Sequence, residues 1–313
     1  MRIVATADVP RVARELFAKL GEIEVNGAAD PVDAEILILR GTPLPAASIE
    51  GASRLRVIAR TGAGYDNVDV DAATRAGIPI VYAPDVGSRP IAEGTVALIL
   101  AAAKRLGELS EIIHTTAWDA RYDVMGLDLE GACLGVVGLG AVGRRVAALC
   151  QALGMVVIAH DPVAPPGTTG EAVELVSLGE LLKRADVITL HCALNEGTRG
   201  LVDAKLLSRM KPGAVLVNAA RGAMVETEDV LADALAAGRL SAVALDVHPS
   251  EPPKAGHRLY RDPRVICTPH TVGLTRRWNE EVFGCLAAGV TRVLAGERPS
   301  NLLNPEALIR STA

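Results

Sequence analysis

Residues 131–161 constrain the fold of this chain more than any other stretch. The apolar, partly β-branched run 134–137 predicts a buried strand, and Gly-Leu-Gly-Ala-Val-Gly at 138–143 leads directly into a helical pattern. Glycines at this spacing permit a tight turn, close approach of the backbone to a pyrophosphate, and close packing of the helix on the strand. The N–H groups at the start of the helix can then hold the phosphate charge. The stretch predicts a dinucleotide-binding unit.

An acidic residue follows at the position that such a unit needs. A second strand is predicted at 155–159, and Asp161 stands at its end, eighteen residues after Gly143. A carboxylate there accepts hydrogen bonds from the ribose 2′- and 3′-hydroxyls and repels a 2′-phosphate, so NAD is predicted rather than NADP. Three glycines also reach this spacing by chance in a Gly-rich chain. The strand before them, the helix after them and the acid at the next strand end argue against chance.

Composition limits the class of protein. Apolar residues make up 50% of the 313 residues, aromatic residues only 3%, and apolar runs alternate with amphipathic segments, as is typical of an α/β protein with parallel sheets. The net charge of −5, with no clustered basic tract, argues against a nucleic-acid partner. The longest uncharged apolar stretch, 94–103, is about half of what spans a bilayer, and no signal peptide is evident at the N-terminus. We expect no membrane partner and a cytoplasmic location.

The cysteines argue for the same location. They form no close pair and lie in apolar sequence, so we expect reduced core residues and no metal site. The five are Cys133, Cys150, Cys192, Cys267 and Cys285.

The order of elements predicts two Rossmann-like domains with parallel sheets, the cofactor domain being inserted in a discontinuous substrate domain. The predicted domains are 1–103, 104–275 for the cofactor, and 276–313 as the return to the first. Strands are predicted at 2–5, 35–39, 56–59, 79–82, 134–137, 155–159, 173–175, 187–190, 214–217, 242–245 and 265–266, and helices at 11–20, 91–105, 178–184, 204–210, 227–237 and 276–294. Between 106 and 128 the pattern weakens. Trp118, Arg121 and Tyr122 there form either an exposed arm for a dimer contact or, equally, a segment in which Trp118 packs on its own domain.

Ligands of an open parallel sheet gather at the carboxyl ends of its strands, and polar groups recur at these ends. They are Gly138, Asp161, His191, Asn218 to Arg221, Asp246 and His270. In the first domain, the turn 61–67 can receive a small anion on its N–H groups, although an ordinary strand-to-helix turn explains it too. The polar loop 83–90 precedes the long apolar helix.

Three of these residues suit reduction of a ketone. Arg221 follows a strand and can bind and polarise a carbonyl, whereas an isolated arginine in such a turn forms a surface salt bridge by default. His270 can exchange the proton, with Glu251 as a partner that fixes the ring and favours its charged form. Asp246 accepts from a nicotinamide amide or supports a turn. The other histidines, His114, His160, His248 and His257, carry no comparable argument and are treated as structural or solvent-facing.

Together these motifs resemble the D-2-hydroxyacid dehydrogenase family over essentially the whole chain. The residues that carry the resemblance are 138–143 with Asp161, 218–222, 246–252, 268–270, 62–69 and 91–93. The resemblance implies catalytic Arg221, Glu251 and His270, and a homodimer built through the cofactor domains. It implies that the substrate is held by Ala63, Gly64, Ser88, Arg89 and Arg221. It implies cofactor contacts from Gly138, Gly140, Ala141, Val142, Gly143, Asp161, His191, Cys192, Thr198, Ala219, Ala220, Arg221, Asp246, His270 and Gly273.

Departures from the family pattern concern the substrate. Gly87 stands where the family usually has Asn, Ala193 where it has Pro, and Thr271-Val272-Gly273 where it has Ile-Gly-Gly. The sequence predicts reversible, NAD-dependent hydride transfer that interconverts a small 2-keto acid, such as hydroxypyruvate or glyoxylate, and the corresponding 2-hydroxy acid, of D configuration where its C2 is chiral. One alternative is D-3-phosphoglycerate dehydrogenase in a short form, with Arg89 holding the phosphate. An alternative of another class is an NAD-binding corepressor, because those proteins of the family retain the same three catalytic residues.

Overall fold

The computed structural model describes residues 1–26, 33–84, 86–164 and 173–310. Its contacts divide the chain into two compact units, one of Met1–Gly87 with Leu274–Ala313 and one of Ser88–Gly273. The division differs from the predicted boundaries mainly in helix α4 (Ser88–Ala103), which belongs to the second unit because Leu98, Ile99 and Ala102 pack in that unit's core. Asp85, in the predicted polar loop, lies outside the described residues.

The first unit is built on a parallel sheet of buried apolar strands. The strand order is β2 (Ile23–Val25), β1 (Ile3–Ala5), β3 (Ile36–Leu39), β4 (Val57–Arg60) and β5 (Ile80–Val81). The strand β3 reads Ile-Leu-Ile-Leu and is buried throughout, as expected when helices cover both faces of a parallel sheet.

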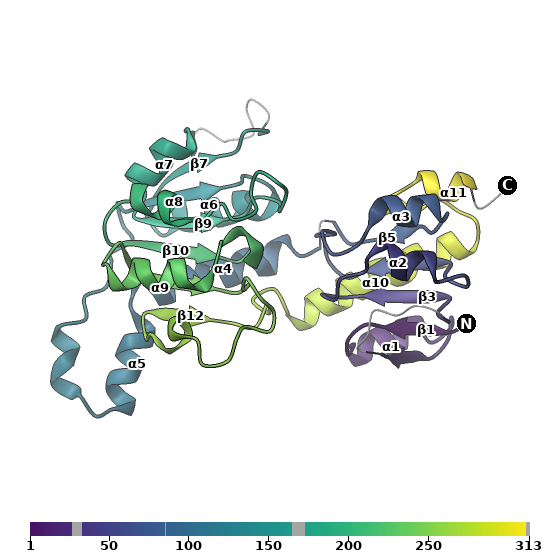
Figure 1. The fold of residues 1–313 in the computed structure, drawn as a ribbon, viewed down its shortest axis with the longest axis horizontal. Coiled ribbons are helices and arrows are strands. Elements are labelled where there is room, and N and C mark those ends of the chain that lie inside the picture. Colours follow the sequence, from purple (N-terminus) through teal and green to yellow (C-terminus); the bar gives the residue numbers. More distant parts are fainter. Residues whose placement is uncertain (27–32, 85, 165–172, 311–313) are drawn as a thin grey trace. The chain divides into compact units, whose positions relative to one another are not determined.

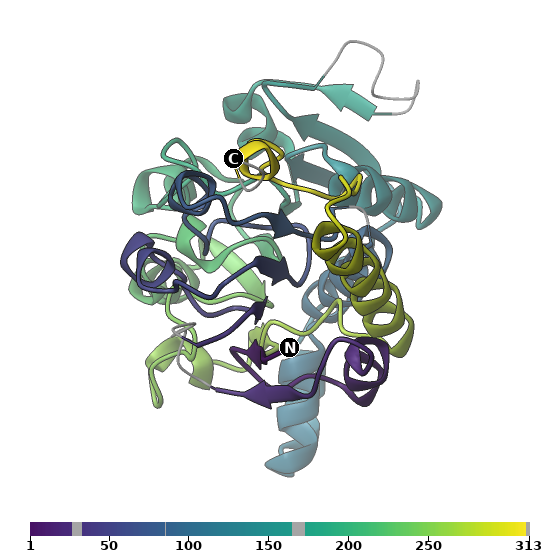
Figure 2. The same cartoon turned by 90° about the vertical axis from the view of Figure 1, so that its right-hand side faces the viewer.

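Helices cover this sheet on its two faces. Figure 2 shows α1 (Arg11–Phe17, purple) and α10 (Arg276–Leu294, yellow-green) on one side of the strands and α2 (Ala46–Glu50) and α3 (Val70–Arg75) on the other. The final helix, α11 (Glu306–Arg310), follows Asn304, whose buried side chain accepts a hydrogen bond from Ile80 N–H at 2.7 Å. The C-terminal segment is therefore an integral part of the first unit.

The second unit contains a parallel sheet of seven strands (Figure 1). Their order is β12 (Val265–Cys267), β11 (Leu240–Leu245), β10 (Ala214–Asn218), β9 (Val187–Leu190), β6 (Cys133–Val137), β7 (Val156–His160) and β8 (Val173–Leu175). The chain runs outward from β6 to β8, then returns to β9 on the other side of β6. The order therefore reverses between β6 and β9, which is where open α/β sheets bind their ligands.

Two layers of helices cover the second sheet. Helices α4 and α6 (Ala141–Ala152) bury one face, and α7 (Leu178–Arg184), α8 (Ala204–Arg209) and α9 (Glu228–Ala236) bury the other. The pattern of apolar residues predicted α4, α7, α8 and α9 to within a few residues, and the helical pattern after Gly143 predicted α6. Among the described residues, no helix is both long and apolar enough to cross a membrane.

The segment predicted as irregular contains two helices. These are α5 (Leu106–His114) and a 3-10 helix at Trp118–Tyr122, and Figure 1 shows them projecting from the sheet of the second unit. Trp118 and Tyr122 are 59% and 66% exposed, so Trp118 does not pack in the core of its own unit. The Arg121 guanidinium carbon lies 4.8 Å from the centre of the Trp118 ring and 4.1 Å from that of Tyr122. Of the two interpretations of this segment, the exposed arm is the one that the structure supports.

Candidate active site

The glycine turn after β6 lies against the chain leaving β9. Gly138 has φ +95°, and a Cβ on it would lie 2.4 Å from the Cys192 backbone nitrogen. Only glycine fits there, because the left-handed conformation and the contact with backbone both exclude a side chain. The close contact with the Cys192 backbone therefore fixes the turn at the point where the strand order reverses.

The start of α6 fits a bound pyrophosphate. Gly140, its N-cap, is exposed and makes no side-chain cap, and a Cβ on it would meet nothing within 4 Å. A Cβ on Gly143 would lie 2.1 Å from the Gly138 carbonyl oxygen, so glycine is needed there for the helix to sit close to the turn. The helix therefore offers N–H groups and open space to an anion, as a dinucleotide requires.

Asp161 stands at the end of β7, beside this turn. Its Oδ2 accepts a hydrogen bond from Leu139 N–H at 2.7 Å, and its Oδ1 accepts one from Val163 N–H at 3.0 Å. Each carboxylate oxygen has a second lone pair, so both remain able to accept from a ribose hydroxyl. Asp161 thus supports the glycine turn as well as presenting a negative charge next to it.

The end of β9 carries His191 and Cys192. Burial lowers the pKa of His191 to about 4, so its ring is neutral, and its Nε2 lies 2.9 Å from Thr189 Oγ1. Burial also raises the pKa of the Cys192 thiol, whose sulfur lies 3.8 Å from that of Met224. Thr198 donates to the Ala193 carbonyl at 2.7 Å and thereby braces the following loop.

Arg221 occupies a braced turn after β10. The fully buried side chain of Asn218 donates to the Arg221 carbonyl at 2.9 Å and accepts from Ala220 N–H at 3.0 Å. The next residue, Gly222, lies so close to the His248 backbone that a Cβ would come within 1.7 Å of the His248 carbonyl oxygen. This contact holds the Arg221 turn next to the loop that carries Glu251.

His270 and Glu251 form the predicted pair. His270 Nδ1 lies 2.9 Å from Glu251 Oε2, and Glu251 Oε1 accepts a hydrogen bond from His248 N–H at 3.1 Å. Burial raises the pKa of the Glu251 carboxyl, but the hydrogen bond and charge of His270 and the His248 N–H outweigh it, so the pKa is lowered overall. An ionised Glu251 orients the His270 ring and leaves Nε2 for another partner.

Asp246 holds the backbone that leads to and from His270. The residue is 3% exposed, and its Oδ1 accepts from Thr268 Oγ1 at 2.7 Å, Thr271 N–H at 2.7 Å and Val272 N–H at 3.1 Å. Supporting a turn is therefore the role that its Oδ1 has in this structure. Gly273 ends the loop after His270. A Cβ on it would lie 2.7 Å from the Ile91 side chain, so the backbone of this residue packs closely on α4.

The residues predicted to hold the substrate are distributed over both units. In the first, Ala63 is exposed on a turn in which Gly62 has φ +100°. In the second, Ser88 is buried and accepts from Arg145 Nε at 3.1 Å, while exposed Arg89 donates to Glu93 at 2.9 Å. The hydroxyl of Ser88 and the guanidinium of Arg89 are thus already engaged within their own unit.

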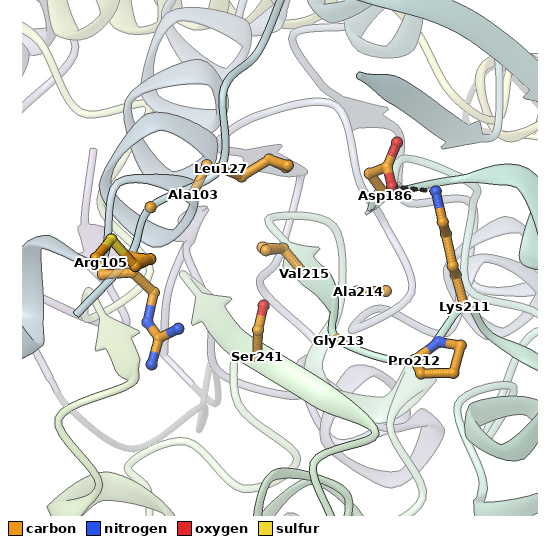
Figure 3. A pocket seen from close by; sticks show the side chains of 12 residues that line it. Ala103, Arg105, Leu127, Asp186, Lys211, Pro212, Gly213, Ala214, Val215 and Ser241 are labelled. Atoms are coloured by element: carbon orange, nitrogen blue, oxygen red, sulfur yellow. Dashed lines mark hydrogen bonds and ion pairs between the residues drawn. The ribbon is translucent and has the colours of Figure 1, made fainter. Parts of the chain in front are cut away.

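A hollow lies at the amino ends of strands in the second sheet, and none of the predicted site residues lines it. Its walls include Asp186, Val215 and Ser241, which lie at the amino ends of β9, β10 and β11. Figure 3 shows the Asp186–Lys211 ion pair at one side of it and Arg105 at the other. His191, Arg221 and Asp246 follow the carboxyl ends of the same three strands. Within the parts of the chain that the structure describes, no cluster of His, Cys, Asp and Glu side chains could hold a metal ion.

The sequence reasoning assigned no individual role to three residues that shape the site. Asn218, Thr268 and His248 are the ones whose side chains brace the Arg221 and His270 turns. The position of Asn218 and Thr268 at strand ends was a signal for the first two. Nothing in the sequence signalled a role for His248.

Comparisons with known proteins agree with this geometry. Residues 96–272 match the family model described as D-isomer specific 2-hydroxyacid dehydrogenase, NAD binding domain. The D-3-phosphoglycerate dehydrogenase of Methanocaldococcus jannaschii is 38% identical over 97% of this chain and 59% of its own length. The glyoxylate reductase of Aeropyrum pernix is 34% identical over 97% of this chain and 96% of its own. The crystal structure of the TT0316 protein from Thermus thermophilus has a TM-score of 0.88 at 34% identity, covering 97% of this chain and 100% of that one.

The lengths of these relatives differ. The chain spans about three fifths of the M. jannaschii phosphoglycerate dehydrogenase but nearly all of the A. pernix glyoxylate reductase. The second unit is an NAD-binding domain, and the chain belongs to the D-isomer specific 2-hydroxyacid dehydrogenase family.

Proposed function

We propose that this chain catalyses reversible, NAD-dependent interconversion of a small 2-keto acid and a D-2-hydroxy acid, with Arg221, His270 and Glu251 as its catalytic residues. The observation that carries the proposal is the 2.9 Å contact of His270 Nδ1 with Glu251 Oε2 at the carboxyl edge of an NAD-binding sheet. A histidine oriented by a carboxylate is the arrangement that proton exchange with an alkoxide requires.

Each residue has a distinct part in this reaction. NADH, when bound, supplies the hydride. Arg221 attracts the substrate carboxylate and the carbonyl oxygen, on which negative charge develops. His270 gives its Nε2 proton to that oxygen in reduction and takes it back in oxidation. Glu251 stabilises the charged imidazole through Nδ1 and fixes the ring plane.

The cofactor is held by groups of the second unit in this proposal. The N-terminus of α6 would hold the pyrophosphate, and Asp161 would accept hydrogen bonds from the adenosine ribose. The contacts we assign are those at Gly138, Gly140, Ala141, Val142, Gly143, Asp161, His191, Cys192, Thr198, Ala219, Ala220, Arg221, Asp246, His270 and Gly273.

We assign the substrate carboxylate to the N–H groups of Ala63 and Gly64, with Arg221. Among the described residues, the structure records no hydrogen-bond partner for either N–H group. Ser88 and Arg89 are the second set of substrate contacts that we propose. Because Arg89 is paired with Glu93, a phosphorylated substrate must compete with that ion pair. This favours an unphosphorylated acid, while the identity to the M. jannaschii enzyme favours D-3-phosphoglycerate dehydrogenase as the second candidate.

We further propose a cytoplasmic homodimer. The exposed arm carries Trp118, Arg121, Tyr122 and Met125, residue types that are enriched at protein interfaces. All five cysteines are free, which fits a reducing compartment.

The test is the initial rate of NADH oxidation with phosphohydroxypyruvate, hydroxypyruvate, glyoxylate, pyruvate and branched 2-keto acids. Turnover of an unphosphorylated acid supports the proposal. A preference for phosphohydroxypyruvate that Arg89→Ala abolishes would identify the second candidate. Absence of turnover on every acid, together with NADH-dependent assembly, would contradict both and identify an NAD-binding regulator.

A further inference from the structure

The imidazole of His248 is buried at a cost that an apolar ring would avoid. The residue is 6% exposed, and its Nδ1 has no hydrogen-bond partner among the described residues. An unsatisfied polar atom in the interior lowers stability, and a phenylalanine of nearly the same shape would remove that cost. The hydrogen bond that offsets this loss of stability must therefore be made by the other ring nitrogen, Nε2.

His248 Nε2 lies 3.0 Å from the Thr268 carbonyl oxygen. A carbonyl oxygen only accepts hydrogen bonds, so Nε2 carries a proton and is the donor of this bond. The same carbonyl accepts a hydrogen bond from His270 N–H at 3.1 Å. One carbonyl therefore links the buried histidine to the backbone of the catalytic one.

The backbone at His270 needs this support. His270 has φ +57°, in the left-handed region that L side chains rarely adopt. Its N–H group is held by the Asp246 carbonyl at 2.7 Å and by the Thr268 carbonyl. The direction in which the ring leaves the turn depends on this conformation.

His248 also reaches the second member of the pair. Its N–H group donates to Glu251 Oε1 at 3.1 Å, while the other Glu251 oxygen contacts His270. Its ring packs edge-on against Tyr260, with 5.4 Å between the ring centres, and this fixes the ring plane. The main chain of His248 thus holds Glu251, and its side chain holds the turn of His270.

We propose that His248 is a positioning residue, which keeps the Thr268–His270 turn in the conformation that aligns His270 with Glu251 and the substrate. The role rests on the proposed dehydrogenase function, because it acts through the proton-exchanging pair. His248 touches neither substrate nor cofactor in this assignment. Its contribution is the single hydrogen bond from Nε2 to the Thr268 carbonyl.

The experiment compares two substitutions of His248. His248→Phe keeps the packing on Tyr260 and removes the donor, whereas His248→Gln places an amide N–H near the former Nε2. We expect His248→Phe to lower kcat about tenfold, the effect of one hydrogen bond, with KM for NADH changed by less than about twofold. His248→Gln should restore most of kcat. The control is His257→Phe, because His257 also packs on Tyr260, at 6.1 Å, but makes no recorded contact with Thr268.

A second measurement does not depend on turnover. Amide hydrogen exchange at His270 and Thr271 should be faster in His248→Phe than in the wild type, and close to the wild-type rate in His248→Gln. Unchanged kcat and exchange in His248→Phe, or equal losses in both variants, would overturn the proposal. If the wild type reduces no keto acid, the proposed function fails, and the exchange rates alone then decide the role of His248. Should His248→Phe not fold, His248→Asn, whose shorter amide does not reach the carbonyl, replaces it.

Discussion

Glu251 and His270, nineteen residues apart in sequence, share a hydrogen bond of 2.9 Å between Oε2 and Nδ1. Both side chains are partly exposed, at 41% and 49%, so the pair is open to a substrate. Burial alone would raise the pKa of the Glu251 carboxyl, but the hydrogen bond to His270 holds it below its ordinary value and so favours the ionised form, which can stabilise a charged imidazole.

Replacement of His270 by Gln should therefore lower kcat by about 10²- to 10⁴-fold, the usual contribution of a general acid–base group. NADH affinity, measured by fluorescence titration, should change far less. Glu251→Gln should cause a smaller loss of kcat, because the ring keeps a hydrogen-bond partner but loses the charge. The matched control is His114→Gln on the exposed surface of α5, which should leave kcat unchanged. Equal losses of turnover and NADH binding in His270→Gln would instead indicate a structural histidine.

Asp161 should set the preference for NAD. Asp161→Ala would remove both its charge and its bonds to Leu139 and Val163, so Asp161→Asn is the sharper variant, because its amide oxygen still accepts from Leu139 N–H. We expect the ratio of kcat/KM for NADPH to that for NADH to rise by roughly tenfold or more once the repulsion of the 2′-phosphate is gone. An unchanged ratio in both variants would exclude Asp161 from this role.

Alanine substitutions of two glycines in the same turn should have different effects. Gly138→Ala should destabilise the protein by roughly 2–4 kcal/mol, because φ +95° and the contact with Cys192 both reject a Cβ. Gly140→Ala should change the free energy of unfolding by less than about 0.5 kcal/mol, since nothing lies within 4 Å of its Cβ. It should still weaken NADH binding, because the methyl group occupies the space that the pyrophosphate approaches. Urea unfolding and NADH titration of both variants check this, and unaltered NADH binding in Gly140→Ala would refute the assignment.

The sequence predicted the second sheet and its layers well because most of its strands are short apolar runs, and most of these are followed by a helix with 3.6-residue periodicity. It also predicted the contact between Glu251 and His270, since parallel strands bring the loops at their carboxyl ends together. Shorter elements escaped prediction. Strand β2 has three residues and buries only Ile23, and α5 follows Arg105, whose left-handed conformation breaks the pattern from α4.

Two other contacts between distant residues could not be predicted from the sequence. The bond from Arg145 to Ser88 spans 57 positions and occupies a hydroxyl that was expected to face the substrate. The bond from His248 to the Thr268 carbonyl spans 20, and a backbone acceptor leaves no trace in the sequence. Both depend on how elements pack rather than on local pattern.

His191 should make the protein less stable in acid. Its folded pKa of about 4 lies below the ordinary value of 6.5, so between these values the unfolded chain binds a proton that the folded chain does not. The contribution of neutral His191 to the free energy of unfolding is therefore complete above pH 6.5. Below that value it falls as the pH drops, by about 1.4 kcal/mol per pH unit at most. From about pH 7 to about pH 5, the wild type should lose about 2 kcal/mol more than His191→Gln in urea unfolding. A similar loss in both proteins would show that His191 titrates normally.

The arm should control assembly. If Trp118 and Tyr122 lie in a dimer interface, replacing both by Ala should yield a monomer in sedimentation velocity at concentrations where the wild type is a dimer. Because both side chains are exposed within one chain, the free energy of unfolding of the monomer should change by less than about 1 kcal/mol. The control is Leu153→Ala, an exposed apolar residue outside the arm, which should leave the dimer intact. A wild-type protein that sediments as a monomer at every concentration would remove the dimer from the proposal and leave the aromatic arm without a partner.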